Sequence, residues 1–165
     1  MNKYPTYRQI IRFMEEAKHN GYDAEARSLK RKTRPGVDIL QYPRGGRPRT
    51  RRWFWEDVWV GSNPFSGVTT VWYRARPCWQ THYWGYVVKS EDSEQVYKFL
   101  RWARRQRWQR KKASLIEGDA SFAGLRYEVS EIALARAFSS IQKHEIIYRR
   151  RTLIAEVMEV KGICR

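Results

Sequence analysis

Arginine and tryptophan are interleaved in two segments of the chain, and this combination suits a phosphate-rich polymer. Residues 49–55 hold three arginines and two tryptophans, and residues 101–110 hold five arginines and two tryptophans. Arginine guanidinium groups form paired hydrogen bonds with phosphate oxygens, and exposed indole rings stack on unpaired bases. The pattern therefore predicts binding of RNA or single-stranded DNA, because stacking needs bases that are not already paired.

Positive charge is concentrated along the chain. Between Arg27 and Arg52 there are ten lysines or arginines and one acid, Asp38, and between Lys98 and Lys112 there are eight and none. The formal net charge is +16. Because clustered cations repel one another in a compact fold, this concentration indicates a polyanionic partner.

We expect the cationic loop, the cationic helix and a later run of three arginines to form one nucleic-acid-binding surface. The expected contact residues are Lys30, Arg31, Lys32, Arg47, Arg49, Arg51, Arg52, Trp53, Arg101, Trp102, Arg104, Arg105, Arg107, Trp108, Arg110, Arg149, Arg150 and Arg151. For any one tryptophan, burial in the core is the commoner use of the side chain.

Catalytic and metal-binding patterns are weak. The histidines, His19, His82 and His144, have no metal-ligand spacing, and two distant cysteines make neither a disulfide framework nor a zinc site. No phosphate-binding loop is present either, because Gly45-Gly46 is not followed by Lys-Ser or Lys-Thr. We therefore expect no catalytic residue, no metal and no cofactor.

A metal-dependent nuclease is the enzymatic alternative. Such an enzyme needs carboxylates that converge from separate elements. Asp57, Glu128 and Glu145 are the residues that could converge in this way, although their positions in the sequence cannot show it.

The elements that must position these residues follow from hydrophobic periodicity, and they fit a single α+β domain over residues 1–165. An amphipathic helix is predicted at 7–20 and a second at 90–109, whose apolar stripe is Val96, Phe99, Leu100 and Ala103. Residues 27–52 are rich in proline and glycine and are expected to form an ordered basic loop with short extended pieces. Aromatic and β-branched runs predict an antiparallel sheet of about five to six strands, at 53–60, 68–73, 83–88, 125–130, 144–149 and 153–160. Residues 131–137 are expected to be helical or irregular.

A weak internal repeat relates two stretches of the predicted sheet. Phe65, Tyr73 and Gly85 in the first stretch match Phe138, Tyr148 and Gly162 in the second, and both read as strand, basic turn, strand. The sequence therefore predicts a duplicated hairpin.

No apolar run approaches the roughly 20 residues that span a bilayer, and the N-terminal residues lack the apolar stretch of a secretion signal. We therefore expect a cytoplasmic protein with no membrane partner.

Three stretches together resemble a bacterial domain of uncharacterised function that occurs alone or behind helix-turn-helix regulators of the XRE class. They are FMEEAKHNGYDAE, TRPGVDILQYPRG and DVWVGSNPFSGVTTVWYRARPCWQTHYWGYV, followed in the same order by VYKFLRWA and the closing FSSIQKHEIIYRRRTLIAEVMEVKG. The resemblance implies a compact α+β domain with an aromatic-rich sheet, and it carries over no catalytic residues. The basic segments RPRTRR and RWARRQRWQRKK depart from the near-neutral or acidic charge expected of such domains.

Three functions remain open at this point. The first is a non-enzymatic nucleic-acid-binding protein that acts as an accessory subunit of a prokaryotic or mobile-element ribonucleoprotein, including a CRISPR-associated one. The second is a protein-directed inhibitor or adaptor, such as a phage anti-defence factor, that uses the same cations against an acidic protein surface. The third is a small-molecule sensing domain, which would need a concave pocket lined by Trp72, Trp79, Tyr83 and Trp84.

Overall fold

The computed structural model describes residues 4–18, 20, 30–34, 36–43, 47–89, 92–110, 113–135 and 140–164. Its helices and strands, in chain order, are α1 (Tyr7–Lys18), β1 (Lys30–Arg34), β2 (Val37–Tyr42), β3 (Trp53–Val60), β4 (Phe65–Tyr73), β5 (Arg76–Val87), α2 (Ser93–Gln109), β6 (Leu115–Glu117), a short 3-10 helix (Ala120–Phe122), β7 (Leu125–Ala135), β8 (Ser140–Arg149) and β9 (Thr152–Ile163).

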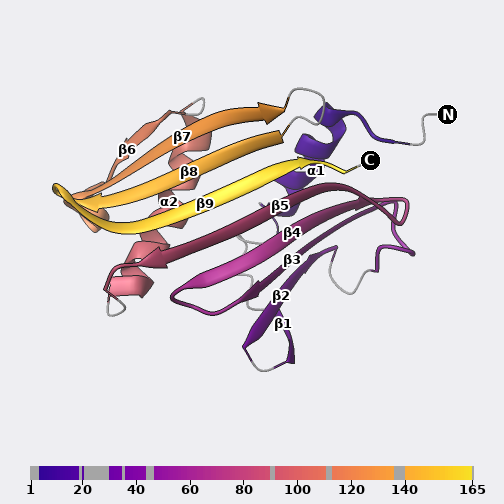
Figure 1. Cartoon of the computed structure of the whole chain (residues 1–165), viewed down its shortest axis with the longest axis horizontal. Helices are drawn as coiled ribbons and strands as arrows, with labels where there is room; N and C mark the ends of the chain where they lie inside the picture. Colours follow the sequence, from indigo (N-terminus) through magenta and orange to yellow (C-terminus); the bar gives the residue numbers. More distant parts are fainter. Residues whose placement is uncertain are drawn as a thin grey trace.

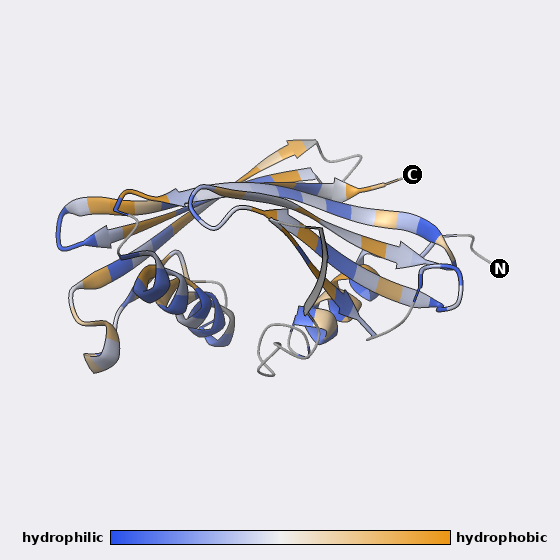
Figure 2. Ribbon diagram, turned by 90° about the horizontal axis from the view of Figure 1, so that it is seen from below, coloured by the Kyte–Doolittle hydropathy of each residue, from blue (hydrophilic) through white to orange (hydrophobic). Residues whose placement is uncertain are grey.

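All the described strands belong to one antiparallel sheet (Figure 1). Their order is β1-β2-β3-β4-β5-β9-β8-β7-β6, so the first and second halves of the chain meet where β5 pairs with β9. The sheet curves over α1 and α2, which lie on the same face at opposite ends (Figure 2). The α+β class is confirmed in broad terms.

The predicted number of five to six strands is wrong, because the described residues form nine. Two of the additional strands, β1 and β2, lie within the proline- and glycine-rich segment that was expected to be mainly loop. Residues 131–135 continue β7 and are not helical, since all of them except Leu134 pair with residues of β8. Strand β5 begins at Arg76, well before the predicted start at 83, because Pro77 is accommodated at a shift in the β4–β5 register.

Two hairpins form the centre of the sheet, as the internal repeat predicts. β4 and β5 join through a turn at Arg74 and Ala75, and β8 and β9 join through a turn at Arg150 and Arg151. The hairpins meet through β5 and β9, where Tyr83 is opposite Glu159. Because these two strands are antiparallel, the two turns lie at opposite ends of the sheet (Figure 1).

Each helix has its own apolar core beneath one half of the sheet. Ile10, Phe13, Met14 and Ala17 of α1 pack on residues of β2 to β5. The predicted stripe of α2, Val96, Phe99, Leu100 and Ala103, is buried against the second half.

The other face of the sheet is covered by no described helix (Figure 2). Strand residues alternate between the two faces, so every second side chain points to this uncovered face. Among the described helices, none is both long enough and apolar enough to cross a membrane.

Candidate functional site

Six arginines gather at the end of the sheet where β4 turns into β5. The backbone N–H of Arg74 donates a hydrogen bond of 2.8 Å to the carbonyl of Arg52, which brings the segment 47–52 against the turn. The guanidinium groups of Arg52 and Arg74 lie 5.6 and 5.4 Å from the centre of the Tyr73 ring. We call the following residues the arginine cluster: Arg47, Arg49, Arg51, Arg52, Arg74 and Arg76.

All six members of the arginine cluster are exposed. Within the described part of the chain, no ion pair joins any of them to a carboxylate. The six positive charges are therefore available to an external anion.

The turn that presents Arg74 has an unfavourable backbone. Arg74 and Ala75 have φ values of 48° and 63°, in the left-handed region that glycine and asparagine adopt most easily. Arg150, at the turn between β8 and β9, has a φ of 57°. Both turns thus carry arginine at a position where glycine or asparagine would fit the backbone better.

Helix α2 does not present the predicted row of free cations. Arg104 points to the sheet and pairs with Glu145 and Glu159, and Arg107 pairs with Glu131 at 3.1 Å. The placement of Arg104 on an exposed binding face is therefore wrong. Arg101, Arg105 and Arg110 are exposed.

Two of the tryptophans predicted to stack on bases are used inside the protein. The Trp53 ring stacks on Phe13, with centroids 5.0 Å apart, and lies against Tyr73 at 4.7 Å. Trp102 packs between Phe99 and Phe122 in the core beneath α2. Both rings are half-buried and pack on other aromatic side chains of the protein, so their main contacts are internal.

The remaining predicted residues lie elsewhere. Lys30, Arg31 and Lys32 are in β1 and Trp108 is in α2, but their side chains are outside the described part of the structure. Arg149 pairs with Asp92, the N-cap of α2, at 3.2 Å, and Arg150 and Arg151 are exposed at the far end of the sheet. The arginine cluster and this second turn lie at opposite ends of the sheet, so the predicted residues do not form one continuous surface.

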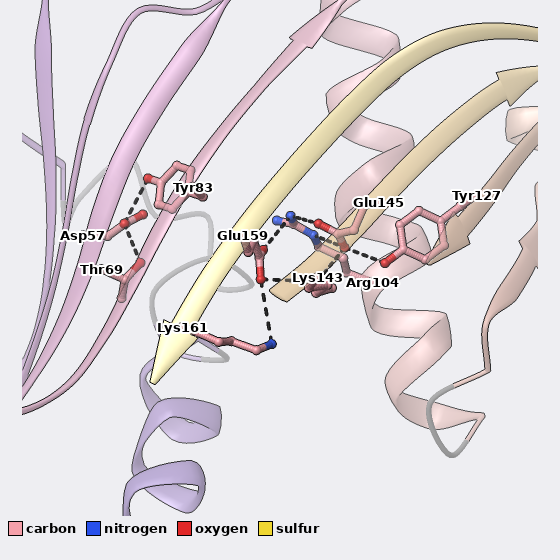
Figure 3. Close-up of polar contacts among 9 residues, drawn as sticks. All are labelled: Asp57, Thr69, Tyr83, Arg104, Tyr127, Lys143, Glu145, Glu159 and Lys161. Atoms are coloured by element: carbon pink, nitrogen blue, oxygen red, sulfur yellow. Dashed lines mark hydrogen bonds and ion pairs between the residues drawn. The ribbon is translucent and has the colours of Figure 1, made fainter. Parts of the chain in front are cut away.

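A second group of charged residues, which the sequence analysis missed, lies on the helix-bearing face of the sheet (Figure 3). We call it the buried charge cluster, and it consists of Arg104, Tyr127, Lys143, Glu145, Glu159 and Lys161. Arg104 Nε donates to Glu145 at 3.0 Å and its Nη2 donates to Glu159 at 3.1 Å, while Tyr127 Oη donates to Glu145. Lys143 Nζ lies 2.6 Å from Glu145 and 3.5 Å from Glu159.

The pKa values in this cluster follow from burial and from the neighbouring charges. Burial alone would raise the pKa of Glu145, but Arg104 and Lys143 outweigh it and hold the pKa well below its usual range. Burial lowers the pKa of Lys161 to about 8, because Glu159, 3.9 Å away, compensates only in part. The carboxylates are therefore ionised and matched by internal cations, which is an arrangement suited to holding α2 on the sheet.

A smaller polar group lies beside this cluster. Asp57 is buried and accepts hydrogen bonds from Thr69 Oγ1 at 2.7 Å and from Tyr83 Oη at 3.0 Å. Burial and the neighbouring carboxylate raise the pKa of Tyr83, so the phenol stays protonated as a donor.

The residues proposed for a nuclease do not converge. Asp57 and Glu145 lie on the helix-bearing face, but Glu128 follows the inward-facing Tyr127 and therefore points to the opposite face. Among the described residues, no group of three histidine, cysteine, aspartate or glutamate side chains could hold a metal ion.

The four aromatic residues of the sensing hypothesis do not form a pocket together either. Trp79 is buried in the core beneath α1, while Trp84 lies on the opposite face of β5 and is 49% exposed.

The sequence contains a signal that could have revealed the buried charge cluster. Lys143 and Glu145 are two residues apart in one predicted strand, and Glu159 and Lys161 are two apart in another. Such spacing places each pair on one face of a strand, and opposite charges on neighbouring strands attract each other.

A family model described as a domain of unknown function, DUF5680, matches residues 57–164. The chain belongs to the DUF5680 family. The matched region includes β4 to β9, α2, both hairpin turns and the whole buried charge cluster. It begins after α1 and after the arginines at 47–52, so only Arg74 and Arg76 of the arginine cluster lie within it. The family likeness assigns no binding or catalytic residue.

Neither the curated proteins nor the solved structures include a match to the chain.

Proposed function

We propose that this protein binds nucleic acid by contacting phosphates with the arginine cluster. The observation that carries the proposal is the gathering of six exposed arginines from two segments at one end of the sheet, with no carboxylate partner among the described residues. Guanidinium groups in this state are strong and geometrically specific ligands for phosphate.

The energetics of the cluster support the same proposal. Like charges at close range repel, and a backbone held in the left-handed region at Arg74 and Ala75 adds strain. A polyanion would relieve the repulsion, and the release of its condensed counterions would favour binding. The proposed role is therefore binding without catalysis, as an accessory subunit of a larger nucleoprotein assembly.

The experiment compares two double variants that change the net charge equally. Arg49→Glu/Arg74→Glu removes charge from the cluster, and Arg150→Glu/Arg151→Glu removes the same charge at the opposite end of the sheet. Binding to a fluorescent single-stranded oligonucleotide is measured over a range of salt concentrations. Wild-type affinity should fall with salt with a log–log slope of roughly 0.7 to 0.9 per phosphate contacted.

We expect the cluster variant to lose at least about tenfold in affinity and to show a shallower salt slope, because two phosphate contacts are lost. The control should lose much less. Equal losses in both variants would show that only net charge matters, and a wild-type affinity independent of salt would overturn the proposal.

A further inference from the structure

The uncovered face of the sheet carries an aromatic strip without acidic residues. Its residues come from β4 and β5, whose side chains alternate between the two faces. The outward-pointing members are Ser66, Val68, Thr70 and Trp72 of β4, and Gln80, His82, Trp84 and Tyr86 of β5. No carboxylate interrupts these two strands on this face.

Trp84 is the most prominent side chain of this strip. Although it is large and apolar, it is 49% exposed. Its ring lies parallel to that of Tyr86, with an interplanar angle of 9° and centroids 6.4 Å apart. Tyr86 is fixed in turn by a hydrogen bond of 2.7 Å from its hydroxyl to Glu156. The indole is therefore held on an ordered surface and not on a mobile loop.

The surface around Trp84 is hollowed. An open hollow of about 560 Å³ is bordered by apolar side chains of three other strands and by His82. Its apolar lining includes Val58, Val68, Met158 and Val160. A flat aromatic group could lie against Trp84 there and cover apolar surface that is otherwise exposed to water.

The strip leads along β5 toward the end of the sheet that holds the arginine cluster. Arg76 pairs with the inward-facing Tyr73, so a bound strand would pass around the end of the sheet to contact both. Trp84 and Arg76 are in the same strand, eight residues apart, which corresponds to about 26 Å at the usual rise of a β-strand. A strand whose phosphates contact the cluster could thus place bases over the strip within a site of ordinary size for single-stranded nucleic acid, about 4 to 16 nucleotides.

We infer that Trp84 is a stacking platform for an unpaired base of a nucleic-acid strand whose phosphates occupy the arginine cluster. This inference rests on the proposed function and narrows its ligand to single-stranded nucleic acid. A duplex would contact the cluster but could not present the face of a base to Trp84.

The test measures the binding of Trp84→Ala to three fluorescent probes of about 15 nucleotides: a single-stranded oligonucleotide, a duplex of the same length and a strand in which abasic sites replace the bases. Affinity for the single strand should fall roughly 5- to 150-fold, the equivalent of about 1 to 3 kcal/mol per stacked base. Affinities for the duplex and for the abasic strand should stay unchanged. Trp84→Phe should retain most of the single-strand affinity.

Ile132→Ala is the matched control, because Ile132 is 60% exposed and lies on β7, away from the strip. Its affinities should equal those of the wild type. Equal losses of Trp84→Ala on all three probes, or no loss on any, would overturn the stacking role while leaving the arginine cluster intact. A change from dimer to monomer in Trp84→Ala, with unchanged binding, would instead identify the strip as a contact between two copies. If the wild type bound none of the probes, both proposals would fail.

Discussion

Arg104 differs from its neighbours on α2 because it faces two carboxylates of the sheet. Its side chain is 38% exposed, whereas the Glu145 side chain is fully buried. A buried carboxylate is costly when it is ionised without a partner, so the arginine stabilises the fold mainly by compensating Glu145. This explains why a cation in a basic helix contributes to stability and not to an external surface.

Arg104→Ala should therefore lower the free energy of unfolding by about 2 to 4 kcal/mol. This is somewhat less than the roughly 3 to 5 kcal/mol for breaking a fully buried pair, because Arg104 is partly exposed and Lys143 still pairs with Glu145. Chemical denaturation at neutral pH measures the change. Arg110→Ala, at an exposed position after the same helix, should change stability by less than about 0.5 kcal/mol.

The difference between wild type and Arg104→Ala should also depend on pH. The pKa of Glu145 is depressed in the folded protein, so its stabilising effect is present above the unfolded pKa and is lost as the pH falls through the folded pKa. The two unfolding free energies should therefore converge in acid. If the difference in unfolding free energy between wild type and Arg104→Ala stayed constant from neutral to acid pH, Arg104 would act through packing alone.

Lys161 should give a second pH dependence, in the same direction as that of Glu145 but at alkaline pH. Burial lowers its pKa from 10.5 to about 8, so between these values the unfolded chain binds more protons than the folded protein. Stability attributable to Lys161 should therefore rise with pH across that interval. In Lys161→Met this rise should be absent, and the variant should be at least as stable as wild type at pH 7. Denaturation series of both proteins across the interval provide the comparison.

At the scale of elements, the β4–β5 hairpin shows how a turn can be fixed by its strands and not by its own residues. The register from Trp53 to Val60 against β4, and from β4 to β5, leaves only Arg74 and Ala75 to reverse the chain. A two-residue turn of this kind requires positive φ at both positions. The strand pairing thus imposes a backbone that these residue types do not favour.

Ala75→Gly should raise the free energy of unfolding by about 0.5 to 1 kcal/mol, because glycine adopts the left-handed region without a steric penalty. Thermal unfolding measures the gain, and nucleic-acid affinity should not change because all six arginines of the cluster remain. Ala133→Gly, at a β7 position that pairs with Ile141 of β8, should instead lower stability. A loss of stability in both variants would contradict the strained-turn interpretation.

Helix α2, unlike the β4–β5 turn, is determined by its own local sequence. Its apolar stripe is defined by local periodicity, and all four predicted residues are buried. The sequence correctly predicted which side of the helix faces the protein, although it did not predict that Arg104 at the edge of that side would meet carboxylates.

At the scale of the whole molecule, the curved sheet distributes the excess positive charge over different places. The arginine cluster lies at one end, the second arginine turn lies at the other, and α2 packs beneath the second half of the sheet (Figures 1 and 2). The cations behind the net charge of +16 therefore form several local groups and not one charged surface. This arrangement favours a ligand that contacts one end of the sheet over one that covers the whole surface.

The sequence by itself determined the two helices, the two central hairpins and the segments that carry excess charge. These features depend on residue type and on spacing over a few positions, and neighbouring residues decide them. Only the tertiary structure decided which arginines are neutralised and which remain available. Arg104 meets carboxylates 41 and 55 residues further along the chain, whereas the arginine cluster meets no carboxylate among the described residues. Such pairings depend on strand order and register, which bring distant residues together and which local spacing does not specify.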